Sequence, residues 1–207
     1  MKRREIHQLI TESIQFLESL NFKLPLWGYW TAADWQGKDE SISEIVDNVL
    51  GWDLTDFGSN HFHQRGLILF TIRNGNPKKD RKPYAEKIMI VEENQETPMH
   101  YHWSKMEDII NRGGGNLVIE LYNSDSNNQF TQEPVKVKID GILRTVAPGG
   151  KVVLTPGESI CLEQGIYHRF YGEEGKGRVL VGEVSAVNDD SNDNCFYETV
   201  GRFPDII

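Results

Sequence analysis

The sequence predicts a mainly β protein, a sandwich or barrel of short strands preceded by a helical segment. Three observations lead to this prediction. In residues 1–21, apolar side chains recur at three- and four-residue steps, the period of a helix with one buried face. From residue 66 onward, the apolar runs are short and rich in β-branched residues. Turn signals built on Gly, Pro, Asn and Asp separate these runs roughly every ten residues, as in all-β domains.

The N-terminal part is expected to contain two helices. The first spans residues 1–21, and its apolar stripe consists of Ile6, Leu9, Ile10, Ile14, Leu17 and Leu20. An aromatic connection, residues 25–35, follows it. The second helix is predicted to start at Ser41, because Glu44 completes a capping box three residues later. Gly51 stands where a helix of this length would have its C-cap.

The β domain is expected to start after this helical segment. We therefore divide the chain into an N-terminal helical and aromatic extension, residues 1–65, packed on a β-barrel formed by residues 66–207. The predicted strands are 66–72, 86–92, 98–102, 107–111, 116–122, 134–139, 142–147, 151–154, 159–162, 167–171 and 178–185.

Composition and charge exclude several classes of partner. A chain of 207 residues with 38% hydrophobic residues suits one domain with a substantial core. Its net charge of -9 repels nucleic acid and anionic membranes, so we expect neither as a partner. The start of the chain is amphipathic rather than continuously apolar, and there are only two cysteines. We therefore expect a cytoplasmic protein in which the two cysteines imply no disulfide bond. The charge is compatible with a neutral or cationic substrate.

Four residues have the spacing of a metal site. His100 and His102 lie two residues apart, so a strand would place both imidazoles on one face. A turn over residues 103–105 would return Glu107 on the neighbouring strand, beside the histidines. His168 follows Gly165 at the start of a later strand. Three imidazoles and one carboxylate are a suitable ligand set for Mn, Fe, Co, Ni or Zn.

A second histidine pair fits a metal site less well. His61 and His63 are also two residues apart, but Ile68 stands where the carboxylate would be expected. Gly58, Ser59 and Asn60 precede this pair, as in a loop. We therefore expect His61 and His63 to take no part in metal binding.

The metal pattern resembles that of the cupin superfamily. Residues 97–114 match the first cupin metal motif, and residues 156–168 resemble the second, with Glu163 where many cupins have proline. This resemblance implies the cupin double-stranded β-barrel, of jelly-roll type. It assigns the metal to His100, His102, Glu107 and His168.

A closer resemblance involves three segments. The stretches MHYHWSKMEDIINRGGGN (residues 99–116), KPYAEK (82–87) and VNDD (187–190) are similar to the D-lyxose isomerase family. The resemblance extends over most of the chain. It implies a manganese-dependent aldose–ketose isomerase, most often of D-lyxose and D-xylulose and also of D-mannose and D-fructose. It also implies a homodimer. Co2+, Fe2+, Ni2+ and Zn2+ are the other ions that this ligand set accepts.

Isomerisation of a 2-hydroxy aldehyde needs a base, a Lewis acid and support for negative charge. The expected intermediate is a cis-enediol, formed when a carboxylate removes the C2 proton and returns it to C1. Glu183 is the predicted base, because it interrupts the apolar strand 178–185, which we expect to pair with the His168 strand. Lys105 is expected to contact the substrate and to offset the charge of the intermediate.

Other residues are weaker candidates. Asp190 and Glu198 are the alternative proton-transferring acids. Trp103 lies inside the metal motif and is a candidate for contact with the sugar ring. Asp190 is also a candidate for contact with the substrate, and it belongs to an acidic, Asn-rich stretch that is either a solvated loop or a polar loop over the barrel mouth.

The ligand set also permits two other functions. Cupin barrels with these ligands support oxygen chemistry, so a non-haem iron dioxygenase is one alternative. A sugar-binding cupin without turnover is the other, although the acid candidates near the metal argue against it. The sequence does not rank these sugars or metals.

Overall fold

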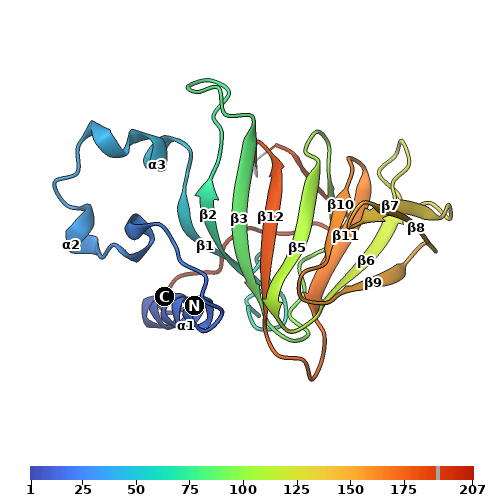
Figure 1. The fold of residues 1–207 in the computed structure, drawn as a ribbon, viewed down its shortest axis with the longest axis horizontal. Coiled ribbons are helices and arrows are strands. Elements are labelled where there is room, and N and C mark those ends of the chain that lie inside the picture. The colour runs from blue at the N-terminus through green and yellow to red at the C-terminus, as the bar shows by residue number, and fades with distance from the viewer. Residues whose placement is uncertain (190–191) are drawn as a thin grey trace.

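Two antiparallel β-sheets form the body of the protein, as seen in a computed structural model that describes residues 1–189 and 192–207 (Figure 1). The larger sheet has the order β1 (Gly51–Thr55), β2 (Leu67–Arg73), β3 (Tyr84–Val91), β12 (Val179–Ala186), β5 (Glu107–Gly114), β10 (Ser159–Leu162), β7 (Val135–Ile139), β8 (Ile142–Val146). The smaller sheet has the order β13 (Asn194–Phe196), β4 (His100–His102), β11 (Ile166–Gly172), β6 (Leu117–Asn123), β9 (Gly150–Leu154).

This arrangement is the cupin double-stranded β-barrel that the sequence predicts. The chain crosses between the two sheets, so strands distant in sequence become neighbours: β12 lies between β3 and β5. The inner faces of both sheets meet in a core of apolar side chains with Ile109, Leu121, Ile160 and Val181 among its fully buried members. Side chains alternate between the two faces of a strand, so every second residue points into this apolar core. Polar or charged residues at these inward positions are candidates for function, because burying them is costly.

The N-terminal segment begins with α1 (Arg3–Ser19). Its buried Leu17 packs with Leu24 against Phe70, Ile88 and Leu180 of the larger sheet. After α1 the chain forms only short elements: η1 (Leu26–Tyr29), α2 (Ala32–Trp35), η2 (Glu40–Ile42) and α3 (Ser43–Asp47). In Figure 1 the part with α2 and α3 projects to the side of the sheets, and the two chain ends lie together at α1.

The second predicted helix is wrong in its start and its end. Asp39 caps η2 by accepting from the Ser41 N–H, and α3 then begins at Ser43 without a side-chain cap. Gly51 does not cap a helix but opens β1, which pairs with β2. The turn before it bends sharply, with Val49 in the left-handed region at φ 54°. Packing of the following tryptophan, Trp52, on Phe70 (ring centroids 5.1 Å apart) favours the strand over continued helix.

Two further strand predictions need correction. β13 is absent from the sequence prediction, because its three residues follow a polar stretch and show no alternation. The Glu183 strand, β12, does not pair with the His168 strand: β12 lies in the larger sheet and β11 in the smaller one. The physical reason is the barrel topology: the chain changes sheets between β11 and β12, so these two strands belong to different sheets although they are neighbours in sequence.

In the part of the chain that the structure describes, no helix combines the length and apolarity needed to cross a bilayer.

Candidate active site

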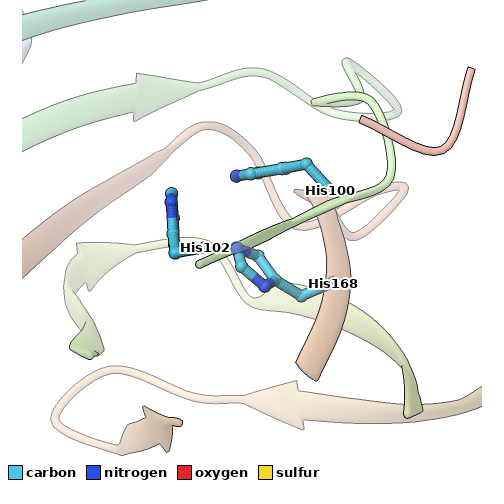
Figure 2. A group of neighbouring side chains, drawn as sticks. All are labelled: His100, His102 and His168. Atoms are coloured by element: carbon cyan, nitrogen blue, oxygen red, sulfur yellow. The ribbon is translucent and has the colours of Figure 1, made fainter. Parts of the chain in front are cut away.

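Three histidines from the smaller sheet point toward one another (Figure 2). β4 supplies His100 and His102 on one face, and β11 supplies His168, which pairs directly with His100. One nitrogen from each ring lies within 4.8 Å of the others. The two-residue spacing and the pairing of the strands therefore bring the predicted imidazoles together.

Backbone carbonyls fix the orientation of two of these rings. His100 Nδ1 lies 2.8 Å from the Pro98 carbonyl oxygen, and His168 Nδ1 lies 3.0 Å from that of Ile166. A carbonyl only accepts, so each Nδ1 carries the proton and each Nε2 keeps its lone pair. Burial, reinforced by the neighbouring His168 and His102, lowers the pKa of His100 well below its usual range. The His100 ring is therefore neutral at neutral pH, as a metal ligand requires.

The buried ring nitrogens have the unpaired positions that a bound metal ion would fill. Among the described residues, His102 Nδ1, His102 Nε2 and His168 Nε2 are buried without a hydrogen-bond partner. A buried polar atom left unpaired costs on the order of 1–3 kcal/mol, which a bound ion would recover. Imidazole nitrogens that converge in this way fit a divalent transition metal.

Glu107 approaches the histidines from the opposite side of the barrel. Its Oε1 lies 3.1 Å from His168 Nε2, and its Oε2 lies 3.4 Å from His102 Nε2. The predicted proximity is confirmed, but the predicted strand arrangement is wrong. Glu107 begins β5 in the larger sheet, which faces the histidine strands instead of pairing with them. The carboxylate thus reaches the same point as the imidazoles across the barrel interior.

Lys105 links two buried carboxylates. Its Nζ lies 2.8 Å from Glu107 Oε2 and 2.8 Å from Glu183 Oε1. Burial by itself would lower the pKa of Lys105, but the negative charges of Glu107 and Glu183 raise it. Burial likewise favours protonated Glu107, yet Lys105 and His102 hold the pKa of that carboxyl well below its usual range. Both groups are therefore charged at neutral pH.

Glu183 faces the barrel interior, as the alternation of β12 predicts. It is 5% exposed, and Val181 and Ser185 on the same face are buried with it. Lys87 lies opposite Glu183 on the neighbouring strand β3, and its Nζ is 3.6 Å from Glu183 Oε1. Although burial opposes ionisation, Lys105 and then Lys87 lower the pKa of Glu183. Glu183 is thus an ionised carboxylate in contact with two lysines.

These groups line a cavity of about 380 Å3. A volume of this size lies in the lower part of the range for small-molecule sites. Apolar side chains such as Leu69, Met89 and Phe170 form part of the wall, while Asp53 and Arg202, 3.9 Å apart, add charged groups. A polar molecule the size of a monosaccharide could therefore contact the histidines, Lys105 and Glu183 together.

The structure does not bring every predicted residue to this cavity. Trp103 is 54% exposed, packs edge-on against Tyr101, and is not among the described residues that line the cavity. Glu198 forms an ion pair with Arg65, 2.8 Å away, and is half exposed. His61 and His63 are exposed. Asp190 lies outside the described residues.

Sequence reasoning missed three charged residues of the cavity, and a signal was available for one of them. Lys87 interrupts the apolar run of β3 in the same way that Glu183 interrupts β12, and alternation would have placed it inside. Asp53 belongs to β1, which lies inside the helical and aromatic extension predicted for residues 1–65. Arg202 reaches the cavity through the C-terminal segment, where no local pattern indicates its position.

Sequence comparisons with known proteins place this chain in a family. A sequence model described as D-lyxose isomerase matches residues 1–207. A D-lyxose/D-mannose isomerase of Serratia proteamaculans is 49% identical over 209 residues, covering 100% of this chain and 92% of the relative. The enzyme of the same name from Escherichia coli O157:H7 is 49% identical over 206 residues, covering 98% of this chain and 91% of the relative.

Solved structures confirm the fold. The ligand-free L-ribose isomerase of Cellulomonas parahominis superposes with a TM-score of 0.67 at 14% identity, covering 100% of this chain and 98% of that one. The L-ribose isomerase of Geodermatophilus obscurus gives 0.63 at 15% identity, covering 99% and 98%. At this identity the likeness establishes the shared barrel only.

The geometry predicts which residues hold a divalent ion. Replacing His100, His102 or His168 by Ala removes a nitrogen from the converging set, so the affinity for Mn2+ measured by calorimetry should fall at least about tenfold. The double variant His61→Ala/His63→Ala is the control and should bind like the wild type. Undiminished Mn2+ affinity in His100→Ala would contradict the assignment.

Proposed function

This chain belongs to the D-lyxose isomerase family of sugar isomerases, and we propose that it interconverts D-lyxose with D-xylulose, and D-mannose with D-fructose, with a divalent metal ion. The observation that carries the proposal is the buried Glu107–Lys105–Glu183 chain beside three converging imidazoles. It places an ionised carboxylate and an ammonium group beside an ion-binding point. D-lyxose and D-mannose are the sugars in the names of the relatives, and D-xylulose and D-fructose are the ketoses that correspond to them.

We assign the ion to His100, His102, Glu107 and His168, with Mn2+ preferred. A bound ion would polarise the sugar carbonyl as a Lewis acid. Sugar oxygens are hard ligands, which favours an ion that accepts oxygen and six-coordination, such as Mn2+ or Co2+. Fe2+ and Ni2+ also suit the set, whereas Zn2+ favours four-coordination and should work less well.

Glu183 is the group that we propose moves the proton. As a carboxylate it takes the proton from C2 and, after the cis-enediol has formed, returns it to C1, while the hydroxyl proton of O2 passes to O1. Lys105, Lys87 and Ser185 all contact its Oε1. Oε2 is the oxygen that we assign to the substrate proton. The contacts on Oε1 hold the carboxylate in one orientation.

Lys105 has the complementary task. Negative charge develops on the sugar oxygens as the C2 proton leaves, and a buried ammonium group stabilises that charge without reorganising. Its two carboxylate partners at 2.8 Å fix its position before the substrate arrives.

A ketose assay with a panel of sugars tests the function. Protein loaded with Mn2+ should form ketose from D-lyxose and D-mannose, lose activity when the ion is chelated, and regain it when Mn2+ or Co2+ is added. Full turnover in demonstrably metal-free protein would refute the role of the ion. Binding of these sugars without any ketose would refute the isomerase.

Replacing Glu183 by Gln tests the proton transfer. The amide keeps the shape of the side chain but is not a base, so turnover should fall at least about a hundredfold while Mn2+ binding is retained. Glu120→Gln is the matched control, because Glu120 is also a buried strand glutamate, paired with Arg169 at 2.8 Å and not lining the cavity. Near-normal turnover of Glu183→Gln would move the role to another acid.

We also propose that the protein is a cytoplasmic homodimer. The two cysteines are free thiols, which suits a reducing compartment. The segment from η1 to the start of β1 exposes Leu26, Val46 and Val49, which a second copy could cover. Light scattering should give twice the 23.7 kDa of one chain. A mass of one chain at micromolar concentration would contradict the dimer.

A further inference from the structure

An aspartate near the C-terminus reaches the metal site from outside the metal motif. Asp193 is 6% exposed and lies directly before β13. We propose that Asp193 is a positioning residue, which fixes the turn between His102 and Glu107 and thereby aims Lys105 and His102 at the ion. This inference rests on the proposed function, because it concerns the site assigned there.

Residues 103–105 of this turn donate four hydrogen bonds to Asp193. Asp193 Oδ1 accepts from Ser104 N at 2.7 Å and from Ser104 Oγ at 2.5 Å. Its Oδ2 accepts from Lys105 N at 3.0 Å. Its backbone carbonyl accepts from Trp103 N at 3.1 Å. Three consecutive backbone N–H groups of the turn therefore depend on one residue almost ninety positions later in the chain.

The turn needs an external tie because it must bury a charge. Trp103 and Met106 are 54% and 45% exposed, whereas Lys105 between them is 4% exposed. A flexible turn would let the lysine side chain move to water, where an ammonium group is better solvated. By holding the backbone N–H of Lys105 itself, Asp193 keeps the start of this side chain facing the cavity.

The same carboxylate faces the third imidazole. His100 and His168 each donate Nδ1–H to a backbone carbonyl. His102 Nδ1 instead faces Asp193 Oδ2 at 3.8 Å, too far for a hydrogen bond, but with the charge that favours a proton on this nitrogen. That tautomer leaves His102 Nε2 with the lone pair needed by a metal.

The strand after Asp193, β13, also pairs with the strand that carries His100 and His102. β13 pairs with the metal strand in register, Asn194 with His102 and Phe196 with His100. Asp193 thus lies directly before β13, at the end of the β13–β4 ladder where β4 ends and the turn after His102 begins. The C-terminal part of the chain positions two elements of the site through this one contact.

The competing explanation is that Asp193 only closes a turn. The chain offers a matched control at Asp140, whose Oδ1 accepts from Ser159 N at 2.9 Å and from Ser159 Oγ at 2.8 Å. Asp140 repeats the aspartate–serine arrangement at an exposed turn between β7 and β8, and it does not line the cavity. A structural role alone would make the two Asp→Asn variants alike.

Calorimetric titration of metal-free protein with Mn2+ separates these explanations. Asp193→Asn should bind Mn2+ about 10- to 100-fold more weakly, the range found when residues that orient metal ligands are changed. At saturating Mn2+ its kcat should stay below that of the wild type, because Lys105 is no longer held. Asp140→Asn should match the wild type in Mn2+ affinity and kcat.

A result in which Asp193→Asn binds Mn2+ and turns over like Asp140→Asn would overturn the proposal. If Asp193→Asn does not fold, Ser104→Ala removes the hydroxyl contact alone and should weaken Mn2+ binding by a smaller factor, whereas unchanged affinity there would overturn it. The proposed function fails separately: a wild type that binds Mn2+ but converts no sugar would refute the isomerase, while the calorimetric comparison would still decide the role of Asp193.

Discussion

A charge inside this barrel is stable only next to a charge of opposite sign, and the site is arranged around that requirement. Glu107, Lys105, Glu183 and Lys87 are all buried, and their formal charges sum to zero. The ion pairs run without a break from His168 through Glu107, Lys105 and Glu183 to Lys87. Removing one member would leave its partner buried and uncompensated, at a cost of about 3–5 kcal/mol. The chain of charges therefore fixes where each functional group lies.

This charge balance also suits the proposed isomerisation. A divalent ion at the histidines would add two positive charges to a set that is otherwise neutral. The cavity would then attract a substrate that becomes negative as it reacts, and a sugar losing its C2 proton does so. Groups fixed before the reaction stabilise such charge better than water does, because they need no reorganisation. The barrel supplies this rigidity, since the four residues lie on β5, β12, β3 and one tied turn.

The sequence predicts much of this site, and the exceptions have physical reasons. Alternation along strands identified the His100 and His102 face and the inward Glu183, because it depends only on local geometry. It did not show that Glu107 comes from the facing sheet, since sheet membership depends on contacts distant in sequence. β1 was missed because tertiary packing of Trp52 overrides a weak helical pattern, and β13 because three residues carry no period. Asp193 was missed because its function lies in a contact with residues 103–105, which no local pattern reveals.

The central claim is that one ion bridges the two sheets through His100, His102, His168 and Glu107. Anomalous diffraction from crystals soaked in Mn2+ tests it most directly. We expect a single strong peak with ligand distances of roughly 2.0–2.3 Å to Nε2 of the three histidines and to a Glu107 oxygen. A peak at other residues would contradict the account. So would an ion bound by the three histidines while the Glu107 carboxylate remains paired with Lys105 and too far from the ion to bind it.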